Sequence, residues 1–376
     1  MNVVKVKQGE LEVDSALPWS IYDENDRMLL NEGYIISSAS TLDALLSRGV
    51  YREVNNKEKH SQNSIDDTFD ETASPFILIA DYTERLNSIF DDLEHTEEHA
   101  VERVYRLVDA LQWFTERDRE ATLAAIHLSH NKKYSLMHPI HVALMCEVVA
   151  SRMNIANDRR RSLLAAALTS NISIRNFQEM LQRQNSPLTE QQRQQIHDHP
   201  ERSARILGIA GVEDDTWLTI VLQHHEQLDG NGYPHGMVGD DVIQEARLLT
   251  IVDRYTAMIS KRAYREPFLI QDALREFFME KGNAFDELLC LQIIKELGVY
   301  PPGAFVKLKN GEIAIVVKRS PGKSTTPTVK SIIGFDGSHY ANPLIRETVD
   351  PSYMITEVTN FQPSMPLNLD KIWGYA

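Results

Sequence analysis

The chain has 376 residues, of which 42% are hydrophobic and 25% are charged, and its formal net charge is −15. This length predicts roughly two or three domains, each able to bury a hydrophobic core. The acidic balance argues against binding to nucleic-acid polymers or to anionic membranes, although a local cluster of arginines would still accept a small anionic ligand.

The first 53 residues predict a small N-terminal α+β module. Apolar residues alternate with polar ones from Val3 to Val6 and again at Leu11 and Val13, which favours short strands. A short helix is expected to begin near Ser40, a residue type that caps helices. These elements are too short to form a large core, so the module is expected to be minor.

Residues 54–76 are polar and lack periodicity, which indicates a linker. From 77 to 299 apolar residues recur at helical spacing, which predicts an all-helical domain and a mainly α fold class. Its first helices, at 78–128, are interpreted as a cover for the core, with a homodimer face as the alternative. Strand-like runs follow, and Asn310-Gly311 is a hairpin signal. Residues 300–376 are therefore expected to form a small C-terminal β appendage.

The cysteines and the apolar runs indicate where in the cell the protein is expected. Cys146 and Cys290 lie in apolar helical contexts, so they are expected to be buried thiols, which fits a reducing cytosol. The N-terminal residues show no pattern of signal-peptide type, and no run of about 18 apolar residues occurs. No membrane span is predicted, and a cytoplasmic location is expected.

The most informative segment is the block His224-His225-Glu226-Gln227-Leu228-Asp229-Gly230-Asn231-Gly232-Tyr233-Pro234. Two adjacent histidines end a predicted helix, and an acidic, glycine-rich turn follows them directly. Paired imidazoles suit a metal-dependent phosphodiesterase, in which metal ions activate water and stabilise developing charge. The alternative for the two glycines and the proline is a plain turn, although glycine also allows a close backbone approach.

Further polar residues occur within or at the ends of the predicted helices: His138, the pair Ser170-Asn171, His199 before Pro200, and Asp253. Asp253 lies in an otherwise apolar helix, where a carboxylate should not be buried without a partner. A metal ion or a histidine would supply that partner. For most of the other histidines a structural or solvated role is expected.

This arrangement resembles the HD-GYP family, a branch of the HD metal-dependent phosphohydrolases. The resemblance covers about residues 130 to 299 and rests on motifs in the same order: Tyr134 before His138, His199-Pro200, the block from His224 to Pro234, and Asp253 before Arg262-Ala263-Tyr264-Arg265. It implies a helical fold and hydrolysis of cyclic di-GMP, a bacterial second messenger, at a site that holds more than one metal ion, often iron or manganese.

The resemblance also implies a role for each matching residue. His138 and Asp253 would serve one metal together with a His-Asp dyad, whose aspartate bridges to a second metal held by His199, His224 and His225. The loop residues Gly230, Gly232, Tyr233 and Pro234 would support ligand binding and contacts with diguanylate cyclases of the GGDEF type. Arg262 and Arg265 would meet the phosphates of the ligand through their planar donors, with surface salt bridges as the alternative.

The chain departs from the family pattern at four positions. The dyad is replaced by Ser170 and Asn171, so a neutral amide stands where a carboxylate would bridge two cations. Ile174 replaces the lysine that follows the dyad, and Thr256 replaces a second aspartate after Asp253. These changes predict a degenerate site with no intact catalytic set.

Three hypotheses follow from this combination. In the first, the chain binds cyclic di-GMP or a protein partner, with lost or weak hydrolysis. In the second, it is an active phosphodiesterase with an altered, mononuclear metal site. In the third, it is a protein-interaction scaffold whose histidines are structural. The expected cofactor is one divalent metal (Fe, Mn, Zn or Ni) or none, because the same imidazole ligands accept several ions.

Overall fold

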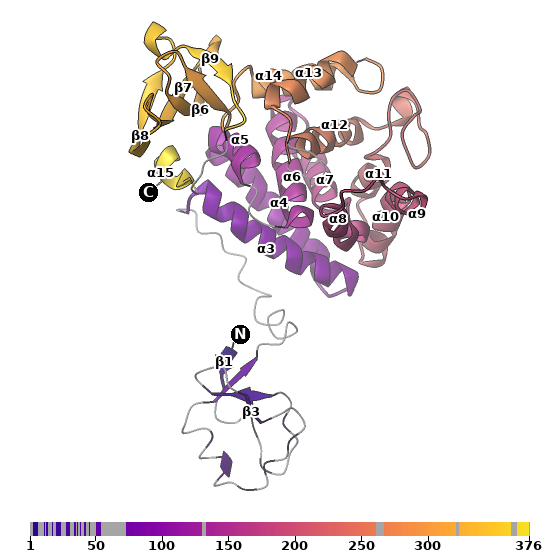
Figure 1. Ribbon diagram of the computed structural model, residues 1–376. Coiled ribbons are helices and arrows are strands. Elements are labelled where there is room, and N and C mark those ends of the chain that lie inside the picture. The colour runs from indigo at the N-terminus through magenta and orange to yellow at the C-terminus, as the bar shows by residue number, and fades with distance from the viewer. Residues whose placement is uncertain are drawn as a thin grey trace. The chain divides into compact units, whose positions relative to one another are not determined.

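The computed structural model describes residues 73–129, 133–260, 267–280, 282–320, 323–361 and 367–375, together with short stretches between residues 3 and 53. The chain divides into two compact units, Met1–Phe69 and Asp70–Ala376 (Figure 1). The finer boundaries at residues 53, 76 and 299 stay predictions.

The N-terminal unit contains a small antiparallel sheet of order β1-β4-β2-β3. Its strands are β1 (Val3–Lys5), β2 (Ile21–Tyr22), β3 (Met28–Leu30) and β4 (Tyr51–Glu53). The strand expected at Leu11 and Val13 was wrong, because both residues lie outside the strands. Leu11 is nevertheless buried in the core of this unit, so its apolar character reflects burial in a loop. Helical residues do follow Ser40, at Thr41, Leu42 and Leu45.

The second unit is mainly helical. Its helices are α3 (Pro75–Glu94), α4 (Ala100–Arg117), α5 (Arg119–Leu128), α6 (Tyr134–Arg152), α7 (Asn157–Thr169), α8 (Arg175–Leu181), α9 (Glu190–His197), α10 (His199–Ile209), α11 (Asp215–Gln223), α12 (Gln244–Ile259), α13 (Ile270–Glu280) and α14 (Glu287–Leu297). Helix α6 is buried along most of its length and packs against α3, α4, α5, α7, α8, α12 and α14. It is the central helix, as expected for a helix that is apolar on all sides.

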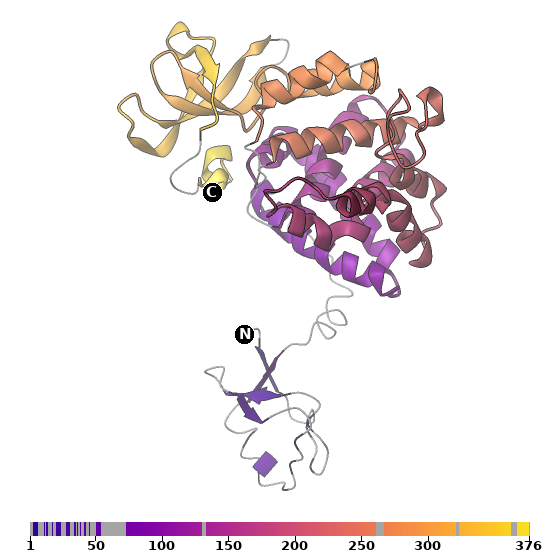
Figure 2. The same ribbon diagram turned by 45° about the vertical axis from the view of Figure 1, so that its right-hand side comes forward.

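A five-stranded antiparallel sheet follows these helices, with strand order β8-β7-β6-β5-β9. Its strands are β5 (Phe305–Leu308), β6 (Ile313–Ser320), β7 (Lys323–Ile333), β8 (His339–Glu347) and β9 (Ile355–Val358). The predicted hairpin at Asn310-Gly311 joins β5 to β6. The sheet packs against α5 (Figure 2), and a last short helix, α15 (Leu369–Trp373), places Trp373 against Phe76 at the start of α3. Strand β8 and helix α15 were not predicted.

The predicted fold class is confirmed: a mainly helical protein with short N-terminal strands and a C-terminal sheet. Among the described residues, no helix is both long and apolar enough to cross a membrane.

Candidate metal centre

His199 is the first residue of α10, and its position is fixed by a turn that the sequence makes explicit. Helix α9 begins with a capping box between Thr189 and Gln192 and ends at His197, and Pro200 is the second residue of the next helix. The Nδ1 atom of His199 bonds the carbonyl oxygen of Ile196 at 2.5 Å. The Nε2 atom of this buried ring is therefore the one that faces the interior.

His224 caps the C-terminus of α11, a helix whose start is fixed by the side chain of Asp214. Its Nδ1 atom bonds the carbonyl oxygen of Val221 at 2.6 Å. Thr250 of α12 donates a hydrogen bond of 2.9 Å to the backbone oxygen of His224, which ties the end of α11 to α12. This ring is fully buried and, like His199, presents Nε2 to the interior.

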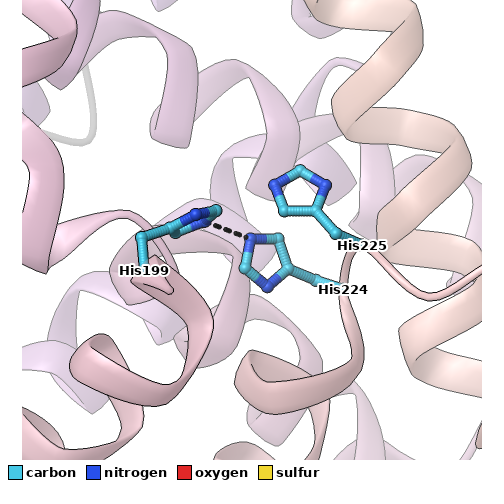
Figure 3. Close-up of side chains that lie close together, drawn as sticks. All are labelled: His199, His224 and His225. Carbon is cyan, nitrogen blue, oxygen red and sulfur yellow. Dashed lines mark hydrogen bonds between the residues drawn. The ribbon is translucent and has the colours of Figure 1, made fainter. Parts of the chain in front are cut away.

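His199, His224 and His225 converge (Figure 3): one ring nitrogen from each lies within 4.8 Å of the other two. The Nε2 atoms of His199 and His224 are 3.1 Å apart. Carbonyl oxygens accept from Nδ1 of both rings, so in their neutral forms both Nε2 atoms carry lone pairs and face each other. Two lone pairs at this distance repel unless a proton or a metal ion lies between them.

Burial disfavours a proton between the two Nε2 atoms. Burial, followed by the neighbouring His224, lowers the pKa of His199 to about 3. Burial also lowers the pKa of His224, and burial with the two neighbouring imidazoles places the pKa of His225 well below its usual range. The three rings are therefore neutral near pH 7, which is the form that binds a transition-metal ion.

Asp253 and His138 form a second pair beside the three histidines. The Oδ1 atom of Asp253, on α12, accepts a hydrogen bond of 2.8 Å from Nε2 of His138, on α6. Burial alone would raise the pKa of Asp253, but the bond from His138 and the nearby imidazoles lower it below its usual value. The expectation that Asp253 has a histidine partner is confirmed. The Nδ1 atom of His138 is buried without a hydrogen-bond partner, and Tyr134 stacks on the ring at 4.8 Å between centroids.

A pocket of about 210 Å³ opens beside these side chains. Of the residues considered from sequence, it is lined by Tyr134, His138, Asn171, Ile174, His199, His225, Tyr233 and Asp253. Residues that the sequence reasoning did not single out also line it, among them Gln178 and Gln182 from α8 and the end of that helix. Because neutral amides carry no motif signal, these glutamines had no signature in the sequence.

Two of the four departing positions do not line the pocket. Ser170 is buried at the end of α7, next to Asn171, whose amide is 3.4 Å from the Ser170 hydroxyl. Thr256 is also buried, and its hydroxyl donates to the carbonyl oxygen of Val252 in its own helix at 2.7 Å. The predicted ligand residues Arg262 and Arg265 lie outside the described residues.

The loop after His225 is held against the pocket by its own backbone and by Glu226. The buried carboxylate of Glu226 accepts from the backbone N–H groups of His235 and Met237 at 2.7 and 2.9 Å. Tyr233 stacks between two imidazoles, at 4.7 Å from His225 and 5.3 Å from His197. The ring of Tyr233 therefore forms a wall of the pocket beside a candidate metal ligand.

Residues 105–289 match the family model described as HD domain. This part of the chain is an HD domain. It is 26% identical over 272 residues to a cyclic di-GMP phosphodiesterase of Pseudomonas aeruginosa, covering 71% of this chain and 65% of that one. It is 24% identical over 200 residues to the cyclic di-GMP phosphodiesterase PdeB of Borreliella burgdorferi, covering 53% and 52%. The chain thus spans between half and two thirds of the length of these relatives.

A solved structure agrees with this HD fold. An HDG"Y"P protein of Bdellovibrio bacteriovorus superposes with a TM-score of 0.51 at 16% identity, covering 78% of this chain and 99% of that one. At this identity the likeness concerns the fold alone. The relatives named as phosphodiesterases and the histidine cluster together fit a metal-dependent HD domain, and the convergent Nε2 lone pairs fit a cation.

Gly232 provides a test of the loop in this HD domain. A Cβ atom added there would lie 2.2 Å from the backbone nitrogen of Gln227 and 2.5 Å from Cα of Glu226. Because these are backbone atoms, Gly232→Ala should lower the free energy of unfolding by about 1–3 kcal/mol, measured by chemical denaturation. Gly208→Ala is the matched control, since no atom lies within 4 Å of its added Cβ. It should stabilise α10, and equal effects of the two changes would contradict the packing argument.

Proposed function

We propose that this chain binds one divalent cation through His199, His224 and His225 and takes part in cyclic di-GMP signalling with lost or weak hydrolysis. In this role it binds the nucleotide or a protein partner. The observation that carries the proposal is the lining of the pocket: among the described residues, Asp253 is its only carboxylate, and Asn171 stands where a bridging aspartate is expected.

Electrostatics explains why one missing carboxylate matters. Two unit charges 4 Å apart repel by about 4 kcal/mol at an effective dielectric constant of about 20, so two divalent cations repel by about 16 kcal/mol. A bridging carboxylate between them offsets much of that repulsion, whereas the neutral amide of Asn171 contributes only a dipole. The carboxylate of Asp253 is already bonded to His138. A single cation at the three histidines is therefore the stable state.

The residues of the pocket would have different roles around that cation. Three imidazoles leave a coordination position open, so the bound ion would supply a Lewis acid for a water molecule or a phosphate oxygen. His138 holds the carboxylate of Asp253 through a hydrogen bond, and the ring of Tyr233 stacks on His225 and restricts its motion. This arrangement favours binding of an anionic oxygen.

The size of the pocket bears on how a ligand would sit. A volume of about 210 Å³ is below the roughly 300–1,000 Å³ that encloses drug-sized molecules. A cyclic dinucleotide would therefore enter only in part. The rest of the ligand would meet the loop residues Gly230, Gly232, Tyr233 and Pro234 and, outside the described residues, Arg262 and Arg265. The same loop is the proposed contact for a GGDEF-type partner, and a homodimer is a further proposal.

A second candidate function is an active phosphodiesterase with a mononuclear site. The observation that favours it is the position of Asp253, a largely buried and ionised carboxylate in the same pocket as His199 and His225. A carboxylate so placed can accept a hydrogen bond from an attacking water molecule and orient it. Fast hydrolysis by the unmodified chain would establish this alternative.

Metal analysis and hydrolysis assays test the proposal together. The full chain is loaded with Fe(II), Mn(II), Zn(II) or Ni(II), and bound metal is counted by mass spectrometry. About one ion per chain is expected, with none in His224→Ala and no loss in His235→Ala, whose side chain is exposed. Cyclic di-GMP should then bind by calorimetry without turnover above the His224→Ala background. Two ions per chain, or fast cleavage, would overturn lost hydrolysis, and no metal at all would favour the scaffold.

A further inference from the structure

A second pocket, of about 270 Å³, lies at the junction of four helices and shares no lining residue with the metal pocket. All of its lining residues are polar or charged: Gln112, Thr115, Glu116, Arg119, Glu147, Ser151, Asn157 and Arg160. They come from α4, the start of α5, the end of α6 and the start of α7. Along α6, Glu147 is roughly 13 Å from His138 at 1.5 Å per residue.

The centre of this pocket is a buried carboxylate held by two donors. Glu147 is 4% exposed and accepts from Arg160 at 2.7 Å and from Gln112 at 3.2 Å. Arg119 lies beside it, anchored by the carbonyl oxygen of Val148 at 2.7 Å and by Ser151 at 2.9 Å. Burial raises the pKa of Glu147 and lowers that of Arg119, so the surrounding protein solvates both charges poorly.

Thr115 gives this pocket an unused hydrogen-bond donor. Its side chain is 2% exposed, and its hydroxyl has no hydrogen-bond partner. Most other buried helical threonines among the described residues donate to the carbonyl oxygen four residues earlier, as Thr122, Thr169 and Thr256 do. Thr115 does not use its own helix in this way. Buried polar groups are almost always satisfied, so its hydroxyl calls for a partner inside the pocket.

Arg160 has a second unsatisfied donor in the same place. Its Nε atom is buried without a hydrogen-bond partner, although its terminal nitrogens bond Glu147 and Asn157. The Thr115 hydroxyl and the Arg160 Nε–H group are thus donors available to an oxygen. Glu116 supplies an acceptor and forms no ion pair within the described parts of the chain. Its negative charge lies close enough to Glu147 to disfavour the ionisation of Glu147. A donor placed between the two carboxylates would relieve that repulsion.

The balance of charges narrows the class of ligand. The side chains that line the cavity carry two guanidinium groups, of Arg119 and Arg160, and two carboxylates, of Glu116 and Glu147. Arg119 also pairs with Glu296, outside the lining, at 3.4 Å. A simple anion would meet two carboxylates, and a simple cation would meet two guanidinium groups, so neither is favoured. A molecule that carries both charges satisfies both halves. The volume also lies below the range for drug-sized ligands, which requires a small molecule.

We propose that the pocket between α4, α5, α6 and α7 is a binding site for a small dipolar molecule, namely an α-amino acid. Its carboxylate accepts from the Thr115 hydroxyl and from Arg160, and its ammonium group lies between Glu116 and Glu147. This site is separate from the proposed metal site and does not depend on it. It gives the HD domain a sensor for a metabolite.

The experiment is a thermal-shift screen of the full chain with each of the protein amino acids, followed by calorimetry. Each amino acid is added at up to about 10 mM, which is about tenfold above a Kd of about 1 mM. At least one amino acid should raise the melting temperature by a few degrees in a saturable way. Its N-acetyl and amide derivatives, each lacking one charge, should bind at least about tenfold more weakly. Inorganic phosphate and methylamine serve as probes of a single charge.

Variants complete the test. Thr115→Val should abolish the shift while leaving the unliganded stability unchanged or higher, because it removes an unsatisfied hydroxyl. Thr122→Val is the matched control, since that hydroxyl is satisfied by its own helix, and it should retain the shift. Glu116→Gln should weaken binding, and His224→Ala should leave it intact. No saturable shift with any amino acid, an equal shift in Thr115→Val, or a stronger response to phosphate would overturn the proposal.

Discussion

The double substitution Ser170→His with Asn171→Asp is expected to raise bound metal from about one to about two ions per chain and to raise hydrolysis of cyclic di-GMP at least about 100-fold. A 100-fold gain requires a barrier lower by only about 2.7 kcal/mol. Asn171 already lines the pocket with His199 and Asp253, so an aspartate there would place a negative oxygen among the candidate ligands. The negative charge of that oxygen would offset part of the repulsion between two cations.

The structure also shows how to separate charge from size in this experiment. Asn171→Asp keeps the shape of the side chain, whereas Ser170→His adds a ring at a site that is 2% exposed. The single change Asn171→Asp is therefore measured as well, because it should fold and bind metal more tightly. Asn176→Asp, at an exposed position of α8, is the matched control for added charge. If the refolded double variant gains neither metal nor activity, then Ile174 and Thr256, or the shape of the pocket, also block the reaction.

The second large effect is loss of stability in mild acid when metal is removed by a chelator. The pKa values of His199, His224 and His225 are lowered in the folded state, and that of His199 falls to about 3. Below the ordinary histidine pKa of about 6.5 the unfolded chain binds protons that the folded chain does not, so stability falls as pH falls. Each ring that stays neutral in the folded state lowers the free energy of unfolding by up to about 1.4 kcal/mol per pH unit below about pH 6.

Urea denaturation at a series of pH values measures this slope. His224→Gln should reduce the slope, whereas His235→Gln should leave it unchanged, because His235 is about half exposed and outside the cluster. Adding a divalent metal above pH 6 should raise stability by mass action. The lowered pKa of Asp253 acts in the same direction, since its contribution is lost as pH falls, but only below its ordinary value near 4. A stability that stays constant from pH 7 to 5 would show that the buried rings accept protons.

The residues of the candidate site could be found from sequence because its ligands occupy the ends of regular elements. His199 and His224 stand at the start of α10 and the end of α11, where a proline and a glycine-rich turn mark the boundaries. Asp253 stood out because a carboxylate in an apolar helix needs a partner. Local patterns therefore identified the candidates, and the structure brought His199, His224 and His225 within 4.8 Å.

Other features were beyond the reach of local patterns. Leu11 was placed in a strand because alternation reports burial, and a buried loop alternates as a strand does. Strand β8 was missed because most of its residues are exposed. Polar residues and a proline also interrupt its apolar residues, so no strand pattern stands out. Gln178 and Thr115 carry no motif, and their place in pockets depends on helices far apart in the chain.

The sequence by itself determined the helical fold, the family and the identity of the candidate ligands, since periodicity, turns and motif order are written in neighbouring residues. Only the tertiary structure decided that Asp253 pairs with His138, that two Nε2 lone pairs face each other, and that the Thr115 hydroxyl lacks a partner. The physical reason is that hydrogen bonding and charge are settled between groups within about 4 Å in space. Separation along the chain does not report that distance.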